Sequence, residues 1–257
     1  MSGEAAKLAV VTGGTKRVGA AIAARLATQG YSLALTSHSG SQPEEALATI
    51  MERENTDWQL FDCDLSVTAE IEALVGDVSR HFGRTPDLLV NCVSRFGQDD
   101  WTDIDADDLE DQFATNLFAP VLLSRDLVKA SAGGTAPCIV QILDQRVRSP
   151  NRDQLSYTLS KQALAESVRT LAISFGKRAR VCGVAPGLVL PTDDFAESQI
   201  AYLAGEMPLG LLPDPQDIAQ AVLYLAEARA VTGQIVYVDG GAHLTQFARD
   251  FVHMKPE

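Results

Sequence analysis

The sequence lacks the features that mark membrane, secreted and nucleic-acid-binding proteins. No apolar run in its 257 residues approaches the roughly 18–20 residues that a membrane-spanning helix needs. The first residues do not show the basic-then-apolar layout of a signal peptide. Basic residues number 21 against 34 acidic ones, and the net charge of −13 disfavours a nucleic-acid partner. We therefore expect a cytoplasmic protein that binds neither membrane nor nucleic acid.

Cysteine and histidine are also scarce. The four cysteines and four histidines are scattered, and no two cysteines form a C-x-x-C pair. Most of these cysteines lie in apolar or strand-like stretches, where a small buried thiol is the commonest explanation. The sequence therefore predicts no metal site.

Apolar residues make up 46% of the chain, which is enough for a packed core. Short β-rich runs alternate with longer segments of helical periodicity, and this alternation predicts right-handed βαβ units. We expect a single α/β domain over residues 1–257, of the doubly wound Rossmann type, with a seven-stranded parallel sheet flanked by helices. The strands are expected at 8–12, 32–36, 58–61, 87–91, 138–143, 180–185 and 234–238, and helices up to residue 30, after Pro43, and near 67–82, 104–130, 156–176 and 215–228.

The last part of the chain departs from this alternation. Residues 186–214 show no regular pattern. In the C-terminal tail, about residues 242–257, Leu244, Phe247 and Phe251 recur at spacings of three and four. These spacings predict a short amphipathic helix.

A glycine-rich turn, TGGTKRVG at residues 12–19, joins the first strand to the first helix. Glycine lets the backbone turn tightly and approach a pyrophosphate, while the helix N-terminus supplies free N–H groups and positive potential. A purely structural turn would show the same glycines. The position on the first strand of an alternating βα chain favours a dinucleotide site. Its expected contacts are Gly13, Lys16, Arg17, Val18 and Gly19.

The end of the second strand indicates which dinucleotide is bound. NAD-selective sites carry an acid there, about 20 residues after the glycines, that grips the ribose hydroxyls. This chain instead has Ser37, His38 and Ser39, with no carboxylate until Glu44. Hydroxyls, an imidazole and the two cations of the glycine turn suit a 2′-phosphate, which predicts NADPH. His38 alone is as readily an ordinary surface histidine.

Tyr157 and Lys161 are four residues apart at the start of an expected helix, so they share one face. A nearby ammonium stabilises a phenolate and lowers the pKa of tyrosine from about 10 towards neutral pH, as a proton donor requires. By itself this spacing is common, and the alternative is that Tyr157 and Lys161 are two surface residues without a catalytic role.

Together with the glycine turn, the pair is specific: the chain resembles the short-chain dehydrogenase/reductase family over essentially its whole length. The matching pieces are Thr12-Gly13 with Gly19, Asp64-Leu65, Leu89-Val90-Asn91, Asn116, Tyr157 with Lys161, Ala185-Pro186-Gly187 and Asp239-Gly240-Gly241. The resemblance implies that Tyr157 donates a proton and that Lys161 holds the nicotinamide ribose. It also implies that Asn116 orders a proton-relay water and that Asp64 touches the adenine. Leu65, Asn91, Pro186 and Gly187 are placed at the cofactor in the same way.

Two positions depart from the common family pattern. Arg17 stands where the turn usually has its second glycine, and Asp144 stands where the catalytic serine is usual, thirteen residues before Tyr157. Both departures resemble the pteridine reductase branch, which includes the dihydromonapterin reductases.

Within that branch the resemblance assigns substrate contacts as well as catalytic ones. It aligns Ser94 with the pterin-side serine and Phe96 with the aromatic residue that stacks on the pterin. The resemblance also places Arg17, Asp144, Tyr157 and Leu188 at the substrate. Residues 187–194 match the branch's substrate loop, which we expect over about residues 186–214. Cys92 and Val93 replace the more usual Asn-Ala.

The expected activity is NADPH-dependent reduction of a dihydropterin, such as dihydromonapterin, dihydrobiopterin or possibly dihydrofolate, to the tetrahydro form. Asp144, Tyr157, Lys161 and Asn116 are its expected catalytic residues. The main alternative is a carbonyl reductase that acts on a 3-oxoacyl thioester or another ketone, and a further one is a non-catalytic NADP-sensing protein. Family members are usually tetramers joined through the helices near 104–130 and 156–176, so we expect a homotetramer.

Overall fold

Seven strands form one parallel sheet in the computed structural model, which describes residues 6–189 and 195–255. The strand order is β3-β2-β1-β4-β5-β6-β7, and every neighbouring pair is parallel. The predicted seven-stranded parallel sheet is confirmed, and each strand lies within a residue or two of its expected range. The strands are β1 (Leu8–Val11), β2 (Ser32–Ser37), β3 (Trp58–Asp62), β4 (Leu88–Asn91), β5 (Cys138–Ile142), β6 (Arg180–Pro186) and β7 (Ile235–Val238).

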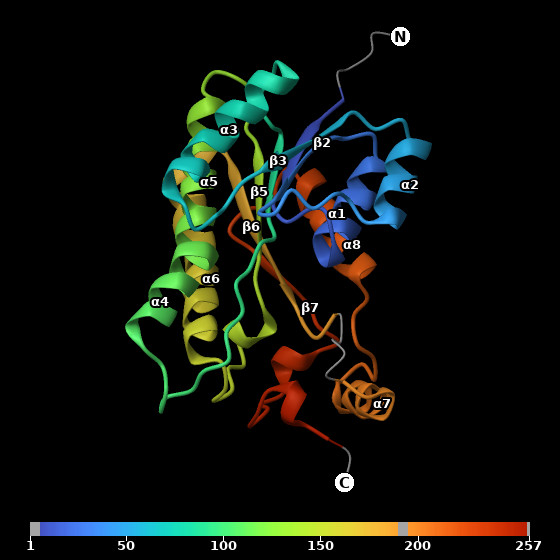
Figure 1. Ribbon diagram of the computed structural model, residues 1–257, viewed down its shortest axis with the longest axis vertical. Coiled ribbons are helices and arrows are strands. Elements are labelled where there is room, and N and C mark those ends of the chain that lie inside the picture. Colours follow the sequence, from blue (N-terminus) through green and yellow to red (C-terminus); the bar gives the residue numbers. More distant parts are fainter. Residues whose placement is uncertain (1–5, 190–194, 256–257) are drawn as a thin grey trace.

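Helices cover both faces of the sheet (Figure 1). On one face lie α1 (Arg17–Ala27), α2 (Glu45–Arg53) and α8 (Pro215–Glu227), which share a buried cluster with the strands. On the other face lie α3 (Thr68–Phe82), α5 (Ala119–Ala130) and α6 (Leu155–Phe175), which share a second cluster. Because both faces are covered, the central strands are apolar on both sides: β1 reads LAVV and is buried throughout.

The strand order places a crevice beside β1. The chain passes from β1 to β2 and β3 on one side and from β4 onward on the other, so the connections leave β1 and β4 in opposite directions. Open α/β sheets bind ligands at such a point, beyond the carboxyl ends of the strands. Here the backbone N–H groups of Cys92 and Val93 both donate to the hydroxyl of Thr12, at 2.8 and 3.2 Å. Those bonds tie the ends of β1 and β4 together at the base of the crevice.

The segment expected as one helix at 104–130 is built from three pieces. After α4 (Ala106–Phe113) comes a single π-helical turn, Ala114–Phe118, and then α5. Turns of this kind inside helices are frequently found at functional sites. This one contains Asn116, a predicted catalytic residue.

The C-terminal part of the chain departs from its expected structure. Helix α7 (Glu197–Glu206) forms inside the segment 186–214 that showed no regular pattern. The expected amphipathic helix is absent from the described residues of the tail, 242–255, which instead form two short 3₁₀ turns, Ala242–Leu244 and Phe251–His253. Phe247 and Phe251 are buried, but Leu244 is 74% exposed, so the three residues do not share one face. The tail is instead held by ion pairs and hydrogen bonds to distant residues, and it lies beside α7 (Figure 1).

No helix of the described residues is long and apolar enough to cross a membrane. All four cysteines are free thiols, and Cys63, Cys138 and Cys182 are buried. Burial raises the pKa of Cys138 to about 12.

Candidate active site

A cleft of about 640 Å³ opens beyond the carboxyl ends of β1, β4, β5 and β6. It brings together residues from the glycine turn, the two loops after β4 and β5, the start of α6 and the segment after β6. The tail closes it with Asp250, Phe251 and Val252. The predicted site residues that line it are Gly13, Lys16, Arg17, Val18, Gly19, Ser94, Phe96, Asp144, Tyr157, Pro186, Gly187 and Leu188.

The glycine turn has the shape that close approach of a ligand requires. Gly13 adopts a φ of +61°, and a Cβ on Gly19 would overlap the backbone of Gly13. Arg17 has a φ of +55°, a left-handed conformation that favours glycine. The family's usual glycine adopts this conformation without a steric penalty. Arg17 has a Cβ, so its backbone is strained there. Lys16 and Arg17 are exposed at the N-terminus of α1, where the helix dipole favours an anion.

Of the residues expected near the 2′-phosphate, Lys16 and Arg17 line the cleft, whereas Ser37, His38 and Ser39 at the end of β2 do not. The hydroxyl of Ser37 accepts hydrogen bonds from the backbone N–H groups of Ser39 and Ser41, at 3.3 and 3.0 Å. His38 is exposed, and its Nδ1 lies 3.5 Å from the carboxylate of Asp64. The structure also brings the carboxylate of Glu44 to the turn, where it accepts a hydrogen bond from the Arg17 N–H at 3.3 Å.

The side chain of Asp64 is held by the loop that follows β3. Its carboxylate accepts hydrogen bonds from the backbone N–H and the hydroxyl of Ser66. These bonds hold the pKa of Asp64 below its usual range. Leu65, next to it, is buried in the core on the α3 side of the sheet.

Tyr157 and Asp144 meet in the cleft. The hydroxyl of Tyr157, in the first turn of α6, donates to Oδ2 of Asp144 at 2.9 Å. Asp144 follows β5 and caps the 3₁₀ turn Gln145–Val147, because its Oδ1 accepts the backbone N–H of Arg146 at 2.9 Å. The carboxylate therefore has one oxygen fixed by the turn and the other bound to the phenol.

The charge state of Tyr157 differs from the sequence prediction. Burial, and then the negative charge of Asp144, raise the pKa of Tyr157 well above its usual value of 10. The predicted lowering is wrong, because burial and the Asp144 carboxylate outweigh the opposite effect of the Arg146 cation. Lys161 is itself buried and donates to the carbonyl oxygen of Ile142 at 2.8 Å, and burial lowers its pKa to about 8.

Asn116 joins the loop after β4 to α6. Its Oδ1 accepts hydrogen bonds from the backbone N–H of Arg95 and the hydroxyl of Ser94, at 2.8 and 3.2 Å. Its Nδ2 donates to the carbonyl oxygen of Arg95 and to the hydroxyl of Ser160, both at 2.9 Å. The amide is buried and thus holds Ser94 in place beside the cleft. Its predicted role of ordering a water stays a prediction.

Asn91 lies deeper, at the end of β4. It is buried, and its Nδ2 donates to the side-chain oxygen of Gln141 on β5 at 3.0 Å. This bond crosses between two neighbouring strands beneath the cleft.

Phe96 presents an exposed aromatic ring to the cleft. The side chain is 51% exposed, and its ring centroid lies 4.8 Å from that of Tyr157 in an edge-to-face arrangement. Ser94 lines the same wall. Of the substrate loop expected at about 186–214, residues 190–194 lie outside the described part of the chain.

Sequence reasoning missed several residues of the cleft. Arg146 follows Asp144 by two positions, a signal that was available once the strand end was placed. Phe195 precedes α7. The tail residues Asp250, Phe251 and Val252 reach the cleft through tertiary contacts that leave no local pattern.

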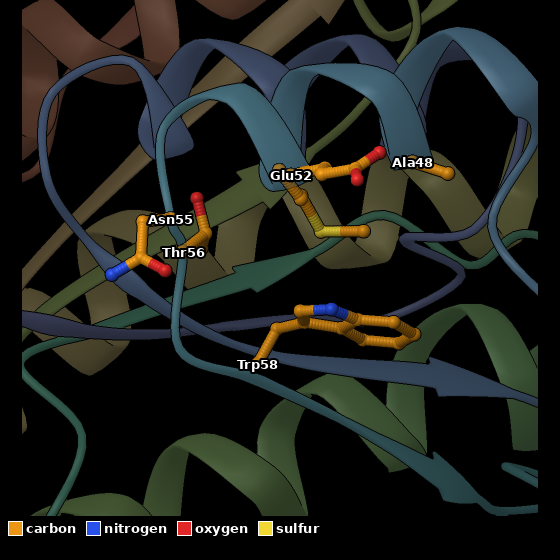
Figure 2. A pocket seen from close by; sticks show the side chains of 6 residues that line it. Ala48, Glu52, Asn55, Thr56 and Trp58 are labelled. Carbon is orange, nitrogen blue, oxygen red and sulfur yellow. The ribbon is translucent and has the colours of Figure 1, made fainter.

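A second pocket lies away from all these residues, between the C-terminal half of α2 and the start of β3 (Figure 2). It measures about 310 Å³, and the indole of Trp58 lies across it from Ala48 and Glu52. None of the predicted site residues lines it. Its lining holds one carboxylate, Glu52, and no cation.

Comparisons with known proteins agree with this arrangement. A family model described as enoyl-(acyl carrier protein) reductase matches residues 14–243. The chain is 30% identical to a glucose and ribitol dehydrogenase homolog of Oryza sativa subsp. japonica, over 91% of this chain and 85% of that one. It is 29% identical to a 3-oxoacyl-[acyl-carrier-protein] reductase of Bos taurus (93% and 99% covered) and 29% identical to pteridine reductase 1 of Leishmania tarentolae (94% and 98% covered).

Among solved structures, the fold is similar to that of FolM alternative dihydrofolate reductase 1 from Brucella suis in complex with NADP. The TM-score is 0.83 at 33% identity, and the match covers 93% of this chain and 96% of that one.

Proposed function

Because the chain belongs to the short-chain dehydrogenase/reductase family, we propose that it is an NADPH-dependent reductase that converts a dihydropterin to the tetrahydro form. The observation that carries the proposal is the hydrogen bond of 2.9 Å between the Tyr157 hydroxyl and the Asp144 carboxylate, beside the exposed ring of Phe96. The similarity to an alternative dihydrofolate reductase and to a pteridine reductase supports it.

The residues of the glycine turn fit a dinucleotide. The close packing of Gly19 on Gly13 lets the backbone approach a pyrophosphate. The first turn of α1 has no acidic residue of its own, and the carboxylate that is brought to it, that of Glu44, accepts the Arg17 N–H. Lys16 and Arg17 add positive charge at the same place and favour NADPH over NADH. When bound, NADPH supplies the hydride.

The protein's own part in the reaction is to deliver a proton. Reduction of one C=N bond of a dihydropterin takes a hydride on carbon and a proton on nitrogen. The pKa of Tyr157 lies above neutral pH, so the phenol carries a proton to donate, although the raised pKa makes it a weaker acid than an ordinary tyrosine. The Asp144 carboxylate accepts the phenol's hydrogen bond and thereby orients the hydroxyl. Proton transfer then runs through Tyr157, with Asp144 and water restoring the proton.

The carboxylate argues for a ring nitrogen rather than a ketone. A ketone that accepts hydride becomes an alkoxide, and an ionised Asp144 next to it would repel that negative charge. A pterin instead offers amino, amide and ring-nitrogen groups that hydrogen-bond to a carboxylate and a guanidinium. Its flat ring can also stack on the face of Phe96.

A carbonyl reductase is the second candidate, and one specific observation favours it. A 3-oxoacyl-[acyl-carrier-protein] reductase is as similar in sequence to this chain as the pteridine reductase is, 29% in each case. In that case Asp144 is a local replacement of the usual serine. A non-catalytic NADP-sensing protein fits less well, because a sensor has no need to keep Tyr157, Lys161 and Asn116 together.

The test is a substrate comparison with the purified protein. NADPH oxidation is followed with dihydrobiopterin, with dihydromonapterin and with an acetoacetyl thioester, each beside a Tyr157→Phe variant as the control for proton transfer. We expect turnover of a dihydropterin that falls by about 10²–10⁴ in Tyr157→Phe. A parent protein that reduces only the thioester would contradict the proposed function.

We also propose that the protein is a homotetramer and that it lies in the cytoplasm. Phe118 and Leu159 are apolar side chains exposed on the helices that would form the subunit contacts, at 53% and 40%. Their exposure supports an interface there, and sedimentation analysis tests it.

A further inference from the structure

Arg146 is a buried cation that the proton-delivery steps above do not use. Only 7% of its side chain is exposed, and it lines the cleft from the 3₁₀ turn after β5. A buried charge costs free energy unless it is paired and hydrogen-bonded. The groups that contact the Arg146 guanidinium therefore indicate its role.

The partners come from segments far apart in the chain. Asp250, in the tail, forms a buried ion pair with the guanidinium, and the side-chain oxygen of Gln154 accepts a hydrogen bond from it at 2.6 Å. The tail has a separate anchor one residue earlier, where Arg249 pairs with Asp153 at 2.9 Å. Asp153 also accepts the backbone N–H of Asp250 at 2.7 Å. The tail is thus fixed independently of Arg146, and it presents the Asp250 carboxylate to it.

On the other side, the same guanidinium faces the reacting groups. Its Nε lies 3.9 Å from Oδ1 of Asp144, the oxygen that also accepts the Arg146 backbone N–H. Its central carbon lies 5.6 Å from the ring centroids of both Phe96 and Tyr157. These are distances at which a guanidinium is attracted to an aromatic face. One side chain therefore contacts the carboxylate, the proton donor and the stacking ring.

We propose that Arg146, held by Asp250 of the C-terminal tail, is a positioning residue that fixes Asp144, Tyr157 and Phe96 in their working geometry. The inference rests on the proposed function for the roles of those three residues. Arg146 holds Oδ1 of the carboxylate, so Oδ2 stays free for the phenol. It also balances the charge of Asp144 beside the buried Tyr157. Asp250 keeps the guanidinium in place over the rings, which makes the tail part of the active site.

A series of variants separates positioning from simple support of the fold. Arg146→Gln removes the cation and leaves the buried carboxylate of Asp250 and the partly buried one of Asp144 without their counter-charge, which destabilises the protein. Adding Asp250→Asn removes one of those carboxylate charges at unchanged shape, so stability should recover in the double variant. Arg146→Lys keeps the charge but loses the planar fork. The matched control is Arg249→Gln, which breaks the other tail ion pair and touches none of the three residues.

For each variant, kcat and KM are measured with NADPH and the dihydropterin that the parent turns over, together with the Kd for NADPH and unfolding in urea. We expect kcat to fall by about 10²-fold in Arg146→Gln, in line with loss of general acid–base catalysis, at unchanged NADPH affinity. In the double variant kcat should stay low although stability recovers. Arg146→Lys should regain part of kcat, and Arg249→Gln should keep the parent's kcat.

Two results would overturn the inference. One is a double variant whose kcat recovers together with its stability, because Arg146 would then only support the fold. The other is a loss in Arg249→Gln as large as in Arg146→Gln, which would assign the effect to tail anchoring in general. A parent that reduces ketones but no dihydropterin contradicts the proposed function instead. The same series, run with that ketone, then still decides whether kcat depends on Arg146.

Discussion

Gly19, in the first turn of α1, packs so closely against Gly13 that a Cβ on Gly19 would overlap the carbonyl oxygen of Gly13. Gly19→Ala should therefore push the turn open, at a cost of about 1–3 kcal/mol for overpacking. We expect both the free energy of unfolding and the affinity for NADPH to fall, as measured by urea unfolding and by cofactor fluorescence.

Gly76 provides the matched control for this prediction. It is also a helical glycine, in α3, but a Cβ added there meets no atom within 4 Å. Gly76→Ala should leave NADPH affinity unchanged and stabilise the helix by about 0.5–1 kcal/mol. Equal effects of the two substitutions would show that the turn does not depend on close packing.

The cofactor prediction is tested at Ser37. We expect the parent to prefer NADPH, and Ser37→Asp to shift the preference towards NADH, because a carboxylate at the end of β2 repels a 2′-phosphate. An aspartate can still accept the loop N–H groups that the Ser37 hydroxyl now accepts, so the loop should keep its shape. The measurement is kcat/KM for both cofactors. A parent that uses them equally well would contradict the assignment.

Asp144→Ser restores the common family residue at unchanged spacing from Tyr157. With a dihydropterin as substrate, kcat/KM should fall by about 10²-fold or more, because a hydroxyl cannot replace the carboxyl in proton delivery. With a test ketone, kcat/KM should hold or rise, because a negative neighbour of the developing alkoxide is gone. If the ketone activity rises in Asp144→Ser and the parent reduces no dihydropterin, the proposed dihydropterin reduction is wrong and only the assignment to the family is left.

The buried amine of Lys161 gives a prediction about stability and pH. Burial lowers its pKa from 10.5 to about 8. Between these values the unfolded chain binds more protons than the folded one, so the contribution of Lys161 to stability rises with pH. Below pH 8 the full cost of burying the charge is present, of the order of 3 kcal/mol for this shift.

Lys161→Met keeps the length of the side chain without the charge. We expect its gain in the free energy of unfolding over the parent to be largest below pH 8 and to shrink as the pH rises to 10.5. Urea unfolding of both proteins at fixed ionic strength measures this difference and cancels the titration of the groups that do not interact with Lys161. A difference that does not change with pH would mean that the amine is not buried as a charge.

The sheet and most helices could be predicted from the sequence because their signals are local. A run such as Leu8–Val11 between a polar start and a glycine turn can only be a buried strand in an alternating chain. The helices that pack on the sheet, such as α1 and α8, show apolar residues at helical spacing in the sequence itself. The same holds for Tyr157 and Lys161, whose spacing already places them on one face of α6.

The charge state and the closure of the site could not be predicted in this way. The raised pKa of Tyr157 depends on how deeply the phenol is buried and on its contact with Asp144, and neither is a property of spacing. The predicted helix of the tail was wrong for a related reason. Periodicity predicted a helix from Phe247 and Phe251, but the position of the tail is set by contacts with distant residues, such as the ion pair of Arg249 with Asp153.

The hydrogen bonds between α7 and the tail affect which tail residues can be substituted without loss of that contact. The side-chain amide of Gln199 donates to the backbone carbonyl oxygens of Phe251, Val252 and Met254. Every amino acid carries that carbonyl, so these bonds survive a change of side chain at residues 252 and 254. A substitution at either position therefore costs only the contacts of its own side chain, whereas loss of the Gln199 amide removes all three of these hydrogen bonds at once.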